Sequence, residues 1–258
     1  APVVANAAGQ DVKPADIPAP RPISAFAKLP FMEGPRLSPD GTRIAARIAI
    51  QGKQRLAIIP IGDTGQPILI DPGDCDLNGW DWVNDQWLVV RAGLMQPLGE
   101  STWYVRRAFG VSASGGQINP LVGPSFGQVA DDVLWVAHDG RPHVLLAMQG
   151  SVFINEVDFW PEVRDFDVST GKSARVQNSI TNVANWYADT AGVVRLGIAY
   201  NNDGRSYRSF YRPAADVSYR TITKGRVGDT AATLPALILP QSGKAIAIED
   251  SDGYDAVY

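Results

Sequence analysis

The sequence has little cysteine and histidine: Cys75 is the single cysteine among 258 residues, and His138 and His143 are the two histidines. One cysteine excludes an internal disulfide framework, and neither it nor the histidines have the spaced partners of a zinc site. Lys and Arg are scattered through a chain of net charge −4, so no basic stripe is available for phosphate contacts. Nucleic acid is therefore not expected as a partner, and no metal or organic cofactor is expected.

Long apolar runs and long amphipathic helical patterns are also missing. No apolar stretch is long enough for a membrane helix, so no membrane span is expected. Hydrophobic residues make up 45% of the chain, and Val, Ile and aromatic residues alternate between clusters of Gly, Pro, Asp and Asn. This pattern is typical of half-buried strands and predicts an all-β fold.

What the sequence does contain is a hairpin signature, Leu37-Ser38-Pro39-Asp40-Gly41, followed by an alternating strand-like run. Proline presets φ, aspartate bonds the local backbone, and glycine accepts a positive φ. One hairpin cannot bury its own apolar face. The motif therefore predicts neighbouring units that pack against it.

Comparable turns recur at intervals of roughly 45 to 55 residues, within the range for propeller blades with loop insertions. They are Asn84-Asp85, His138-Asp139-Gly140, Thr190-Ala191-Gly192 and Gln241-Ser242-Gly243. The segments between them predict four-stranded antiparallel blades, about four and a half in number. We interpret the chain as an incomplete β-propeller.

The expected strands follow from the turns and the alternation. They are residues 34–37, 43–50, 55–60 and 66–70; 79–83, 87–91, 103–111 and 117–122; 133–137, 143–148, 163–168 and 174–177; 183–188, 193–200, 206–211 and 218–223; and 236–239, 245–249 and 254–258. Two segments are too long for tight turns, Ala92 to Thr102 and Gln149 to Glu162. We expect both to be loops, and we expect the aromatic residues of the second to pack over a neighbour rather than bind a ligand.

The two ends of the chain suggest its organisation. Ala1 to Pro22 is rich in Ala and Pro and is interpreted as the leader of a mature periplasmic or secreted protein, with a cloning boundary as the alternative. Residues 23–258 are predicted to form one propeller domain that stops within the fifth blade. An open ring is expected to close partially, to form a homodimer through its edges or to swap strands.

One segment of the chain matches a catalytic motif but lacks its context. Residues 123–127 match the G-x-S-x-G pattern of a nucleophile elbow around Ser125. A helix should follow the serine, yet Gln128 to Trp135 has the pattern of a strand, and His138 and His143 follow too soon for a hydrolase triad. We interpret Ser125 as part of a turn between blades, and no catalytic residue is assigned.

Four groups of acidic residues are candidate metal ligands. The group near the carboxyl end resembles part of a calcium loop but lacks the spacing and terminal glutamate of an EF-hand, so a turn over residues 251–253 is the preferred interpretation. No P-loop or dinucleotide fingerprint is present. The acidic groups are Asp74 with Asp76, Asp131 with Asp132, Asp165 with Asp167, and Glu249, Asp250, Asp252 and Asp255.

Several segments resemble a known family. Residues 26–30, Phe26-Ala27-Lys28-Leu29-Pro30, followed by the hairpin signature, resemble the start of the amino-terminal propeller in bacterial prolyl oligopeptidase (S9) family serine peptidases, a group that includes dipeptidyl peptidase IV and acylaminoacyl peptidases. Residues 166–172 are similar to the aspartate, strand and Thr-Gly outer turn of those propellers, and residues 186–195 to a blade opening of exported members. The resemblance spans most of residues 23–258.

The resemblance implies a lid that gates access of substrate. In that family the propeller caps an α/β-hydrolase domain, which supplies the serine, aspartate and histidine of the triad. The implied partners are the α/β-hydrolase domain of the same parent chain and a peptide substrate that passes through the propeller. The chain alone is expected to be inactive. TolB-like propellers share the Ser-Pro-Asp-Gly hairpin, and a periplasmic TolB-like propeller that binds a protein partner is the alternative.

Overall fold

Alternation between apolar and polar residues produces strands almost throughout the chain. The computed structural model describes residues 21–22, 30–62, 65–98, 100–226, 234–240 and 243–258, apart from the side chains of Leu98 and Ser251. Residues 1–20 of the expected leader, the motif over residues 26–29, and Gln241 and Ser242 of the last predicted turn lie outside these ranges. Within them, no helix is long and apolar enough to cross a membrane.

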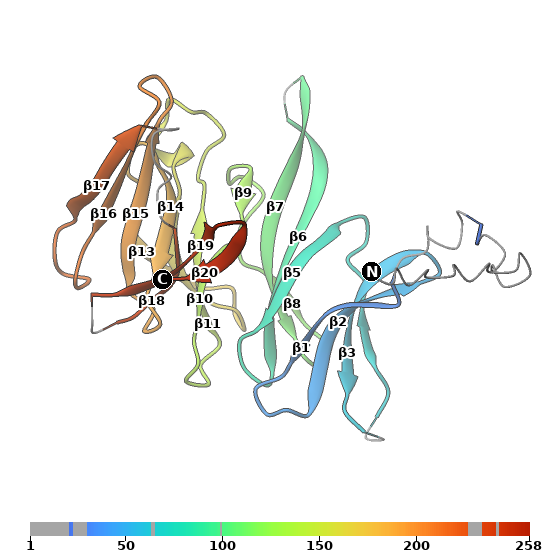
Figure 1. Ribbon diagram of the computed structural model, residues 1–258. Helices are drawn as coiled ribbons and strands as arrows, with labels where there is room; N and C mark the ends of the chain where they lie inside the picture. Colours follow the sequence, from blue (N-terminus) through green and yellow to red (C-terminus); the bar gives the residue numbers. More distant parts are fainter. Residues whose placement is uncertain (1–20, 23–29, 63–64, 99, 227–233, 241–242) are drawn as a thin grey trace, which may run out of the picture.

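The strands form five sheets, and strands consecutive in the sequence are antiparallel neighbours in nearly every case (Figure 1). The first sheet contains β1 (Met32–Leu37), β2 (Arg43–Ile50), β3 (Lys53–Pro60) and β4 (Ile68–Ile70). The second contains β5 (Asp76–Trp82), β6 (Trp87–Leu98), β7 (Ser101–Ser112) and β8 (Ile118–Pro120), with β9 (Val129–Ala130) parallel to β7. The third contains β10 (Asp132–Val136), β11 (His143–Met148), β12 (Glu162–Asp167) and β13 (Ser173–Gln177). The fourth contains β14 (Val183–Ala188), β15 (Val194–Asn201), β16 (Ser206–Tyr211) and β17 (Arg220–Arg226), and the fifth β18 (Pro235–Ile238), β19 (Ala245–Ser251) and β20 (Tyr254–Val257).

These sheets confirm the predicted all-β fold of four-stranded antiparallel blades. Strands β2, β11, β14 and β16 begin and end at the predicted residues. The other predicted strands differ from prediction at one or both ends, most of them by only one to three residues. The predicted turn over residues 251–253 is confirmed between β19 and β20.

The prediction of a loop from Ala92 to Thr102 is wrong. Strands β6 and β7 stay paired up to Leu98 and Ser101, and they form the long two-stranded arm at the top of Figure 1. Strand β5 pairs with β6 only as far as Gly93, so beyond that residue β6 has β7 as its partner. A ribbon with a free edge tolerates Pro97, the residue that obscured the strand pattern.

The prediction of one continuous strand from Gln128 to Trp135 is also wrong. The segment is divided between β9 and β10 by Asp131, which belongs to neither strand. Strand β9 pairs with β7 of the second sheet, whereas β10 begins the third sheet. The chain changes partners at Asp131, and this change makes that residue part of the boundary between two sheets.

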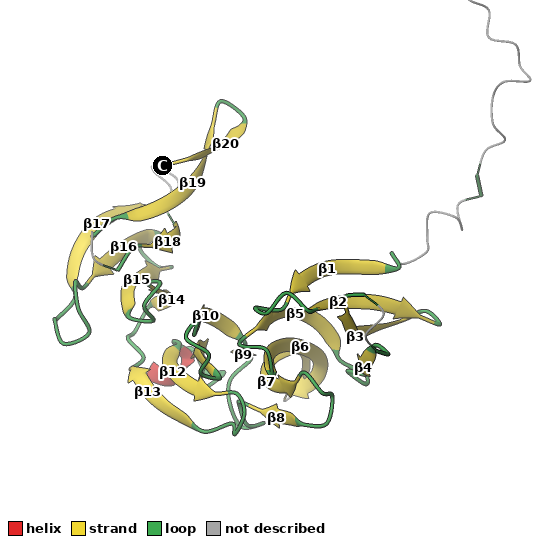
Figure 2. Ribbon diagram, turned by 90° about the horizontal axis from the view of Figure 1, so that it is seen from below, coloured by secondary structure: helices red, strands yellow, loops and turns green. Residues whose placement is uncertain are grey.

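The five sheets lie along an arc with their first strands inward. Seen from below, β1, β5, β10 and β14 face the concave side, and the later strands of these four sheets lie farther out (Figure 2). Strand β1 packs beside β5, β10 beside β14, and β14 beside β18. This radial order is that of a β-propeller, in which each blade packs face to face on the next.

Apolar clusters fill the spaces between neighbouring sheets. Successive residues of a strand point to opposite faces, so adjacent apolar residues in β6 and β11 serve the clusters on both sides of their sheet. Strands buried on both faces explain why these segments are nearly continuous apolar runs. Representative buried members, in order from the first cluster to the fourth, are Leu56 and Leu88, Val89 and Leu146, Leu145 and Trp186, and Ile198 and Ile238.

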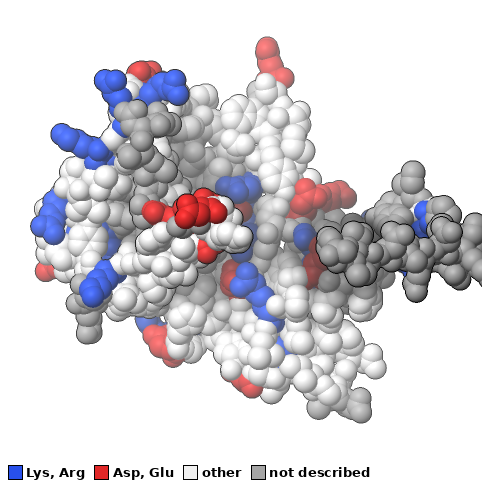
Figure 3. All heavy atoms as spheres, viewed as in Figure 1, with Lys and Arg blue, Asp and Glu red and all other residues white. Residues whose placement is uncertain are grey.

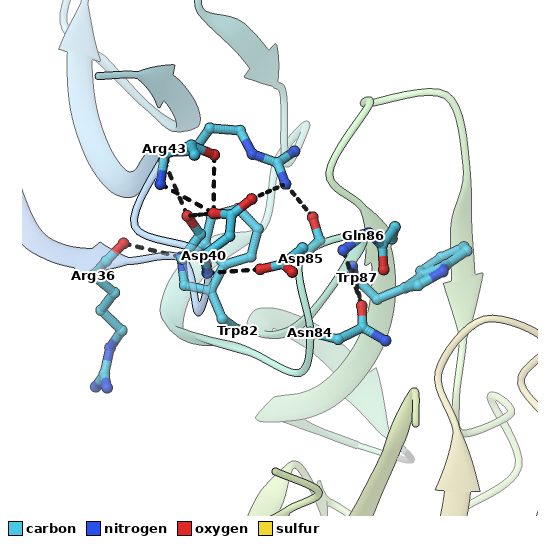
Figure 4. Close-up of polar contacts among 10 residues, drawn as sticks. Arg36, Asp40, Arg43, Trp82, Asn84, Asp85, Gln86 and Trp87 are labelled. Carbon is cyan, nitrogen blue, oxygen red and sulfur yellow. Dashed lines mark hydrogen bonds and ion pairs between the residues drawn. The ribbon is translucent and has the colours of Figure 1, made fainter. Parts of the chain in front are cut away.

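The hairpin between β1 and β2 is fixed by Asp40 (Figure 4). Its Oδ1 accepts hydrogen bonds from the Thr42 backbone N–H at 3.0 Å and from the hydroxyls of Ser38 and Thr42 at 2.6 and 2.9 Å. Gly41 follows with a φ of 71°, in the left-handed region that glycine tolerates. The roles predicted for aspartate and glycine in this turn are therefore confirmed.

The same hairpins join the first three sheets to one another. The backbone N–H of Asp40 donates to Asp85 Oδ1 at 2.9 Å, and the Arg43 guanidinium donates to the Asp85 carbonyl oxygen (Figure 4). The Asn84 side chain then donates to the Gly140 carbonyl oxygen at 2.9 Å. Because each hairpin binds the next one, the repeat in the sequence becomes a continuous line of polar contacts along the lower edge of the arc.

This line continues through the last three sheets. The Trp135 indole N–H donates to the Thr190 carbonyl oxygen at 3.1 Å, and the Thr190 backbone N–H donates to the Ile238 carbonyl oxygen at 3.2 Å. Asp189 Oδ2 accepts from Arg195 Nε at 2.6 Å, and Arg195 Nη2 donates to the Pro240 carbonyl oxygen at 3.0 Å. A buried ion pair thus lies at the junction of the fourth and fifth sheets.

We expect acid to remove the stability that Asp40 contributes. Hydrogen bonds from Ser38 and Thr42 lower the pKa of Asp40 from 3.8 to about 2. Because the folded pKa lies below the unfolded one, the contribution is fully present above about pH 4 and is lost as the pH falls toward about 2. Asp40→Asn should therefore flatten the pH dependence of the free energy of unfolding in this window, measured by urea titration. Asp203→Asn, in the exposed turn after β15, is the matched control, and an unchanged slope in Asp40→Asn would contradict the assignment.

Candidate functional site

The inner strands of the arc border a continuous groove. Three hollows follow one another along β10 and β14, and neighbouring hollows share lining residues. We call them the lower hollow, beside the hairpins, the middle hollow, and the upper pocket, at the end nearer the β6–β7 arm. Asp132 and Asn185 belong to both the middle hollow and the upper pocket. The three hollows lie in a row because the first strands of successive sheets pack side by side. The groove therefore results from the repetition of blades along the chain.

The lower hollow has a volume of about 770 Å³ and is bordered by all five inner strands or the residues next to them. Its wall mixes exposed apolar residues with charge. Leu37, at the end of β1, is 59% exposed and Leu237, on β18, is 40% exposed. Arg36 Nη1 lies 2.8 Å from Asp81 Oδ1 on the same wall. Exposed apolar side chains that gather in a concave surface are typical of an interaction site.

The upper pocket has a volume of about 420 Å³ and lies where three sheets meet. The second sheet contributes Arg91 and Arg106, the third contributes the start of β10 and the end of β11, and the fourth contributes Ala184 and Asn185. Phe159 and its neighbour in the β11–β12 segment complete the wall. Side chains of both charges and two aromatic rings therefore line the same small pocket.

Both arginines of the upper pocket form ion pairs with aspartates. Arg106 Nε lies 3.3 Å from Asp131 Oδ1, and Arg91 Nη2 lies 3.2 Å from Asp81 Oδ2, which connects the pocket to the lower wall. Burial raises the pKa of Asp131, against the opposing attraction of Arg106, Arg91 and Arg107. Desolvation within the pocket likewise raises the pKa of Asp132, and the adjacent charge of Asp131 adds to that effect. The site therefore disfavours further negative charge.

The segment from Gln149 to Glu162 is a loop, as predicted, with one short 3₁₀ turn, η3 (Val157–Phe159). Its start is held where the backbone N–H groups of Gly150 and Ser151 donate to the Asp158 carbonyl oxygen at 2.8 and 2.9 Å. Its end is held by the Trp186 indole, which donates to the Pro161 carbonyl oxygen at 2.7 Å.

The aromatic residues of this loop divide into two groups. Phe159 and Trp160 pack edge to face, with ring centroids 5.2 Å apart, and both line the upper pocket. Phe153 is 62% exposed instead. The expectation that the loop aromatics pack over a neighbour therefore describes only part of the loop, because Phe159 and Trp160 also border a cavity.

The residues considered for catalysis lie in separate places. Ser125 is in the turn between β8 and β9, with no helix after it. His143 Nδ1 lies 2.8 Å from Asp165 Oδ1, on β11 and β12, whereas His138 lines the lower hollow. Within the described ranges no hydrogen bond joins Ser125 to either histidine. The arrangement gives no nucleophile and base pair, and Ser125 remains a turn residue.

The acidic group near the carboxyl end lies on the β19–β20 hairpin. Figure 3 shows Asp and Glu side chains gathered over this hairpin and Lys and Arg side chains toward the rim near β16 and β17. Asp250 and Asp255 are directly opposite in register. Among the residues that the structure describes, no group of three or more His, Cys, Asp or Glu side chains is placed to hold a metal ion.

The five sheets and their inward first strands define the chain as a β-propeller. No family model matches the sequence, and no curated protein matches it either. Among solved structures, a TolB candidate from Agrobacterium tumefaciens is similar at 15% identity and a TM-score of 0.45, covering 76% of this chain and 68% of that one. TolB from Acinetobacter baumannii is similar at 14% identity and a TM-score of 0.40, covering 77% and 45%. The AtxE2 isopeptidase is similar at 13% identity and a TM-score of 0.28, covering 86% and 37%.

The groove is not recognisable in the sequence. Asp131 and Asp132 form an acidic pair, and Trp160 belongs to the long loop between β11 and β12, but nothing in the sequence places them together. Arg91 and Asn185 carried no signal, because they are single polar residues within strand patterns. An acidic pair directly before an inner strand, followed by a long aromatic loop in the same blade, is the one sequence feature that could have suggested this end of the groove.

Proposed function

We propose that this chain is a non-catalytic binding propeller that holds an extended segment of a partner protein in the groove along its inner strands. The observation that carries the proposal is the lower hollow, where exposed apolar side chains from β1 and β18 lie beside the Arg36–Asp81 pair. Apolar anchors rimmed by charge are the usual composition of a protein-recognition surface.

The groove is also continuous along the inner strands, as the binding of an extended segment requires. The three hollows are continuous through shared residues, so a chain could occupy them in succession. The walls are inner strands of hydrogen-bonded sheets, and the hairpin contacts join these sheets to one another. A preformed site lowers the ordering cost that a partner must overcome on binding.

We expect the groove to be sensitive to charge placed among its apolar residues. Peptides selected from a displayed library against the purified chain should lose affinity roughly 10- to 30-fold with Leu237→Asp, since a buried carboxylate replaces an apolar anchor. Fluorescence anisotropy of the labelled peptide measures the change. Leu69→Asp is the matched control, because Leu69 is 46% exposed on the outer strand β4. Equal losses in the two variants would contradict binding in the groove, as would selected peptides that bind both variants normally.

A second candidate function is the gating lid of an exported prolyl oligopeptidase-type peptidase, and the order of the motifs over residues 166–172 and 186–195 favours it. The partners would then be an α/β-hydrolase domain of the same parent chain and a peptide substrate. The mass of the native protein, detected with an antibody against this chain, separates the two functions. A mass of roughly 65 to 80 kDa would leave room for a hydrolase domain. A mass near that of this chain would favour the binding propeller.

The domain limits and the location are part of the same proposal. We assign residues 23–258 to one propeller domain and Ala1 to Pro22 to a leader, and we place the protein in the periplasm or outside the cell. The composition of the leader and the exported-type blade opening support this location.

A further inference from the structure

The basic residues of the fourth sheet lack the carboxylate partners that arginines have elsewhere in the chain. Ten of the eleven arginines from Arg36 to Arg195 form an ion pair with Asp or Glu. The next six Lys and Arg residues, from Arg205 to Arg226, form no ion pair with any described carboxylate. Positive charge is therefore in excess on β16, β17 and their connections, in a chain whose net charge is −4.

Strand pairing brings three of these cations onto one face of the sheet. Arg208 on β16 is directly opposite Lys224 on β17, and Ser206 is directly opposite Arg226. Directly opposed residues share a face, and so do residues two apart along a strand. Arg208, Lys224 and Arg226, all exposed, therefore form one cluster, which we call the cationic face. Figure 3 shows Lys and Arg side chains along this rim of the molecule.

The cationic face is unfavourable for the isolated sheet. Like charges directly opposite each other in an antiparallel pair repel, so the pairing of Arg208 with Lys224 costs stability. The Arg208 guanidinium lies 5.5 Å from the centre of the Phe210 ring, a contact that orients the side chain but supplies no carboxylate. A negatively charged partner on this face would replace repulsion by attraction. The cluster therefore indicates an anionic ligand.

Strand β17 determines what shape of ligand fits. It is the last strand of its sheet, and within the described ranges it pairs with β16 alone. The N–H and C=O groups along its outer side can therefore pair with a further strand. Exposed sheet edges bind extended segments in this way, by β-strand addition. Every second side chain of an added strand would point to the same face as Lys224 and Arg226.

Phosphate polymers and lipid surfaces match these features less well. Single-stranded nucleic acid is usually held by aromatic side chains on which bases stack, and β17 contains no aromatic residue. A membrane surface would contact the cations but would leave the backbone of the edge strand unpaired. An acidic protein segment satisfies both the charge and the backbone.

We propose that the outer edge of the fourth sheet binds an acidic, extended segment of a partner protein, which adds to β17 as a further strand. Carboxylates at alternate positions of the segment pair with Lys224 and Arg226, and its backbone pairs with that of β17. This surface is separate from the groove along the inner strands. The inference therefore goes beyond the proposed function and does not depend on it.

Three labelled peptides of equal charge test the proposal. The first alternates Glu and Thr over eight residues, the second has four Glu followed by four Thr, and the third is the alternating peptide methylated at every backbone nitrogen. Fluorescence anisotropy at low salt measures their binding to the chain. The alternating peptide should bind roughly fivefold more tightly than the second, because only alternation places all carboxylates on one face. Methylation should weaken binding roughly tenfold, because it removes the backbone donors.

Two double variants assign the site. Lys224→Gln with Arg226→Gln should weaken the alternating peptide roughly fivefold, since two cross-strand ion pairs are lost. Lys53→Gln with Lys172→Gln changes the net charge equally at exposed positions near the first and third sheets, and it should leave the affinity unchanged. Amide spectra verify that both variants are folded.

Hydrogen exchange of the unmodified chain locates the segment without any variant. Saturation with the alternating peptide should slow exchange within residues 220–226, because an added strand engages backbone groups of β17. Exchange that slows only in other strands would overturn the proposal. Equal binding of the three peptides, or equal losses in the two double variants, would also overturn it.

Probes of the other two classes complete the experiment. Phosphatidylglycerol vesicles and a single-stranded oligonucleotide are titrated against the complex with the alternating peptide. We expect neither to bind the cationic face as tightly as the peptide does. If either binds more tightly and is weakened by the Lys224 and Arg226 double variant, the face serves a membrane or a nucleic acid, and the acidic segment is refuted.

Discussion

Replacing Asp189 by alanine should lower the free energy of unfolding by about 4 kcal/mol. The Asp189 carboxylate accepts hydrogen bonds from the backbone N–H groups of Ala191 and Val193, both at 2.9 Å, in addition to its ion pair with Arg195. Asp189 is 1% exposed and Arg195 is 7% exposed. The variant leaves a buried guanidinium without its counter-charge and two backbone donors without acceptors, and urea unfolding followed by circular dichroism measures the loss.

The preceding blade supplies the control for this variant. Asp139 lies in the equivalent hairpin and pairs with Arg141 at 2.8 Å, but both side chains are more than half exposed. Exposed ion pairs contribute little, so Asp139→Ala should cause a much smaller loss. Similar losses for Asp139→Ala and Asp189→Ala would mean that burial of the pair does not set its importance, contrary to the assignment of Asp189 as the polar junction of the fourth and fifth sheets.

Replacing Trp186 by alanine should also lower the free energy of unfolding by about 4 kcal/mol. Trp186 is 1% exposed and packs against Phe210 and Tyr219, with ring centroids 6.1 and 5.6 Å away. Its indole also fixes the carbonyl oxygen of Pro161, at the end of the loop that lines the upper pocket. The variant creates a large cavity between the third and fourth sheets, and the same urea titration measures its cost.

A second tryptophan tests whether burial determines this cost. Trp103 lies on β7 in the exposed arm and is 38% exposed. Trp103→Ala should therefore cost far less than Trp186→Ala. A Trp186→Ala variant as stable as the wild type would contradict the packing between the third and fourth sheets.

The strands were predictable where local rules and tertiary structure agree. In β2 and β11 the apolar pattern, the flanking turn residues and the sheet all favour the same limits. The β6–β7 arm was missed because Gly93 and Pro97 interrupt the pattern, and only the free edge of a two-stranded ribbon makes them acceptable. The break at Asp131 was missed because the change of pairing partner from β7 to the third sheet is a long-range event.

The candidate site was less predictable than the fold. Its walls come from strands that are far apart in the sequence, and only the radial packing of blades brings Arg91, Asp131, Trp160 and Asn185 together. The first four hairpin turns were predictable from the sequence, yet these hairpins only support the groove. The groove lies on the inner strands, whose polar residues look like ordinary strand residues until their neighbours are known.

The most direct test of the binding groove is to map where a selected peptide lies. A peptide carrying a benzophenone group is irradiated in complex with the chain, and the cross-linked residues are identified by mass spectrometry. Binding in the groove predicts cross-links on β1, β10, β14 and β18. Cross-links confined to the outer strands β4, β8, β13 and β17 would contradict it.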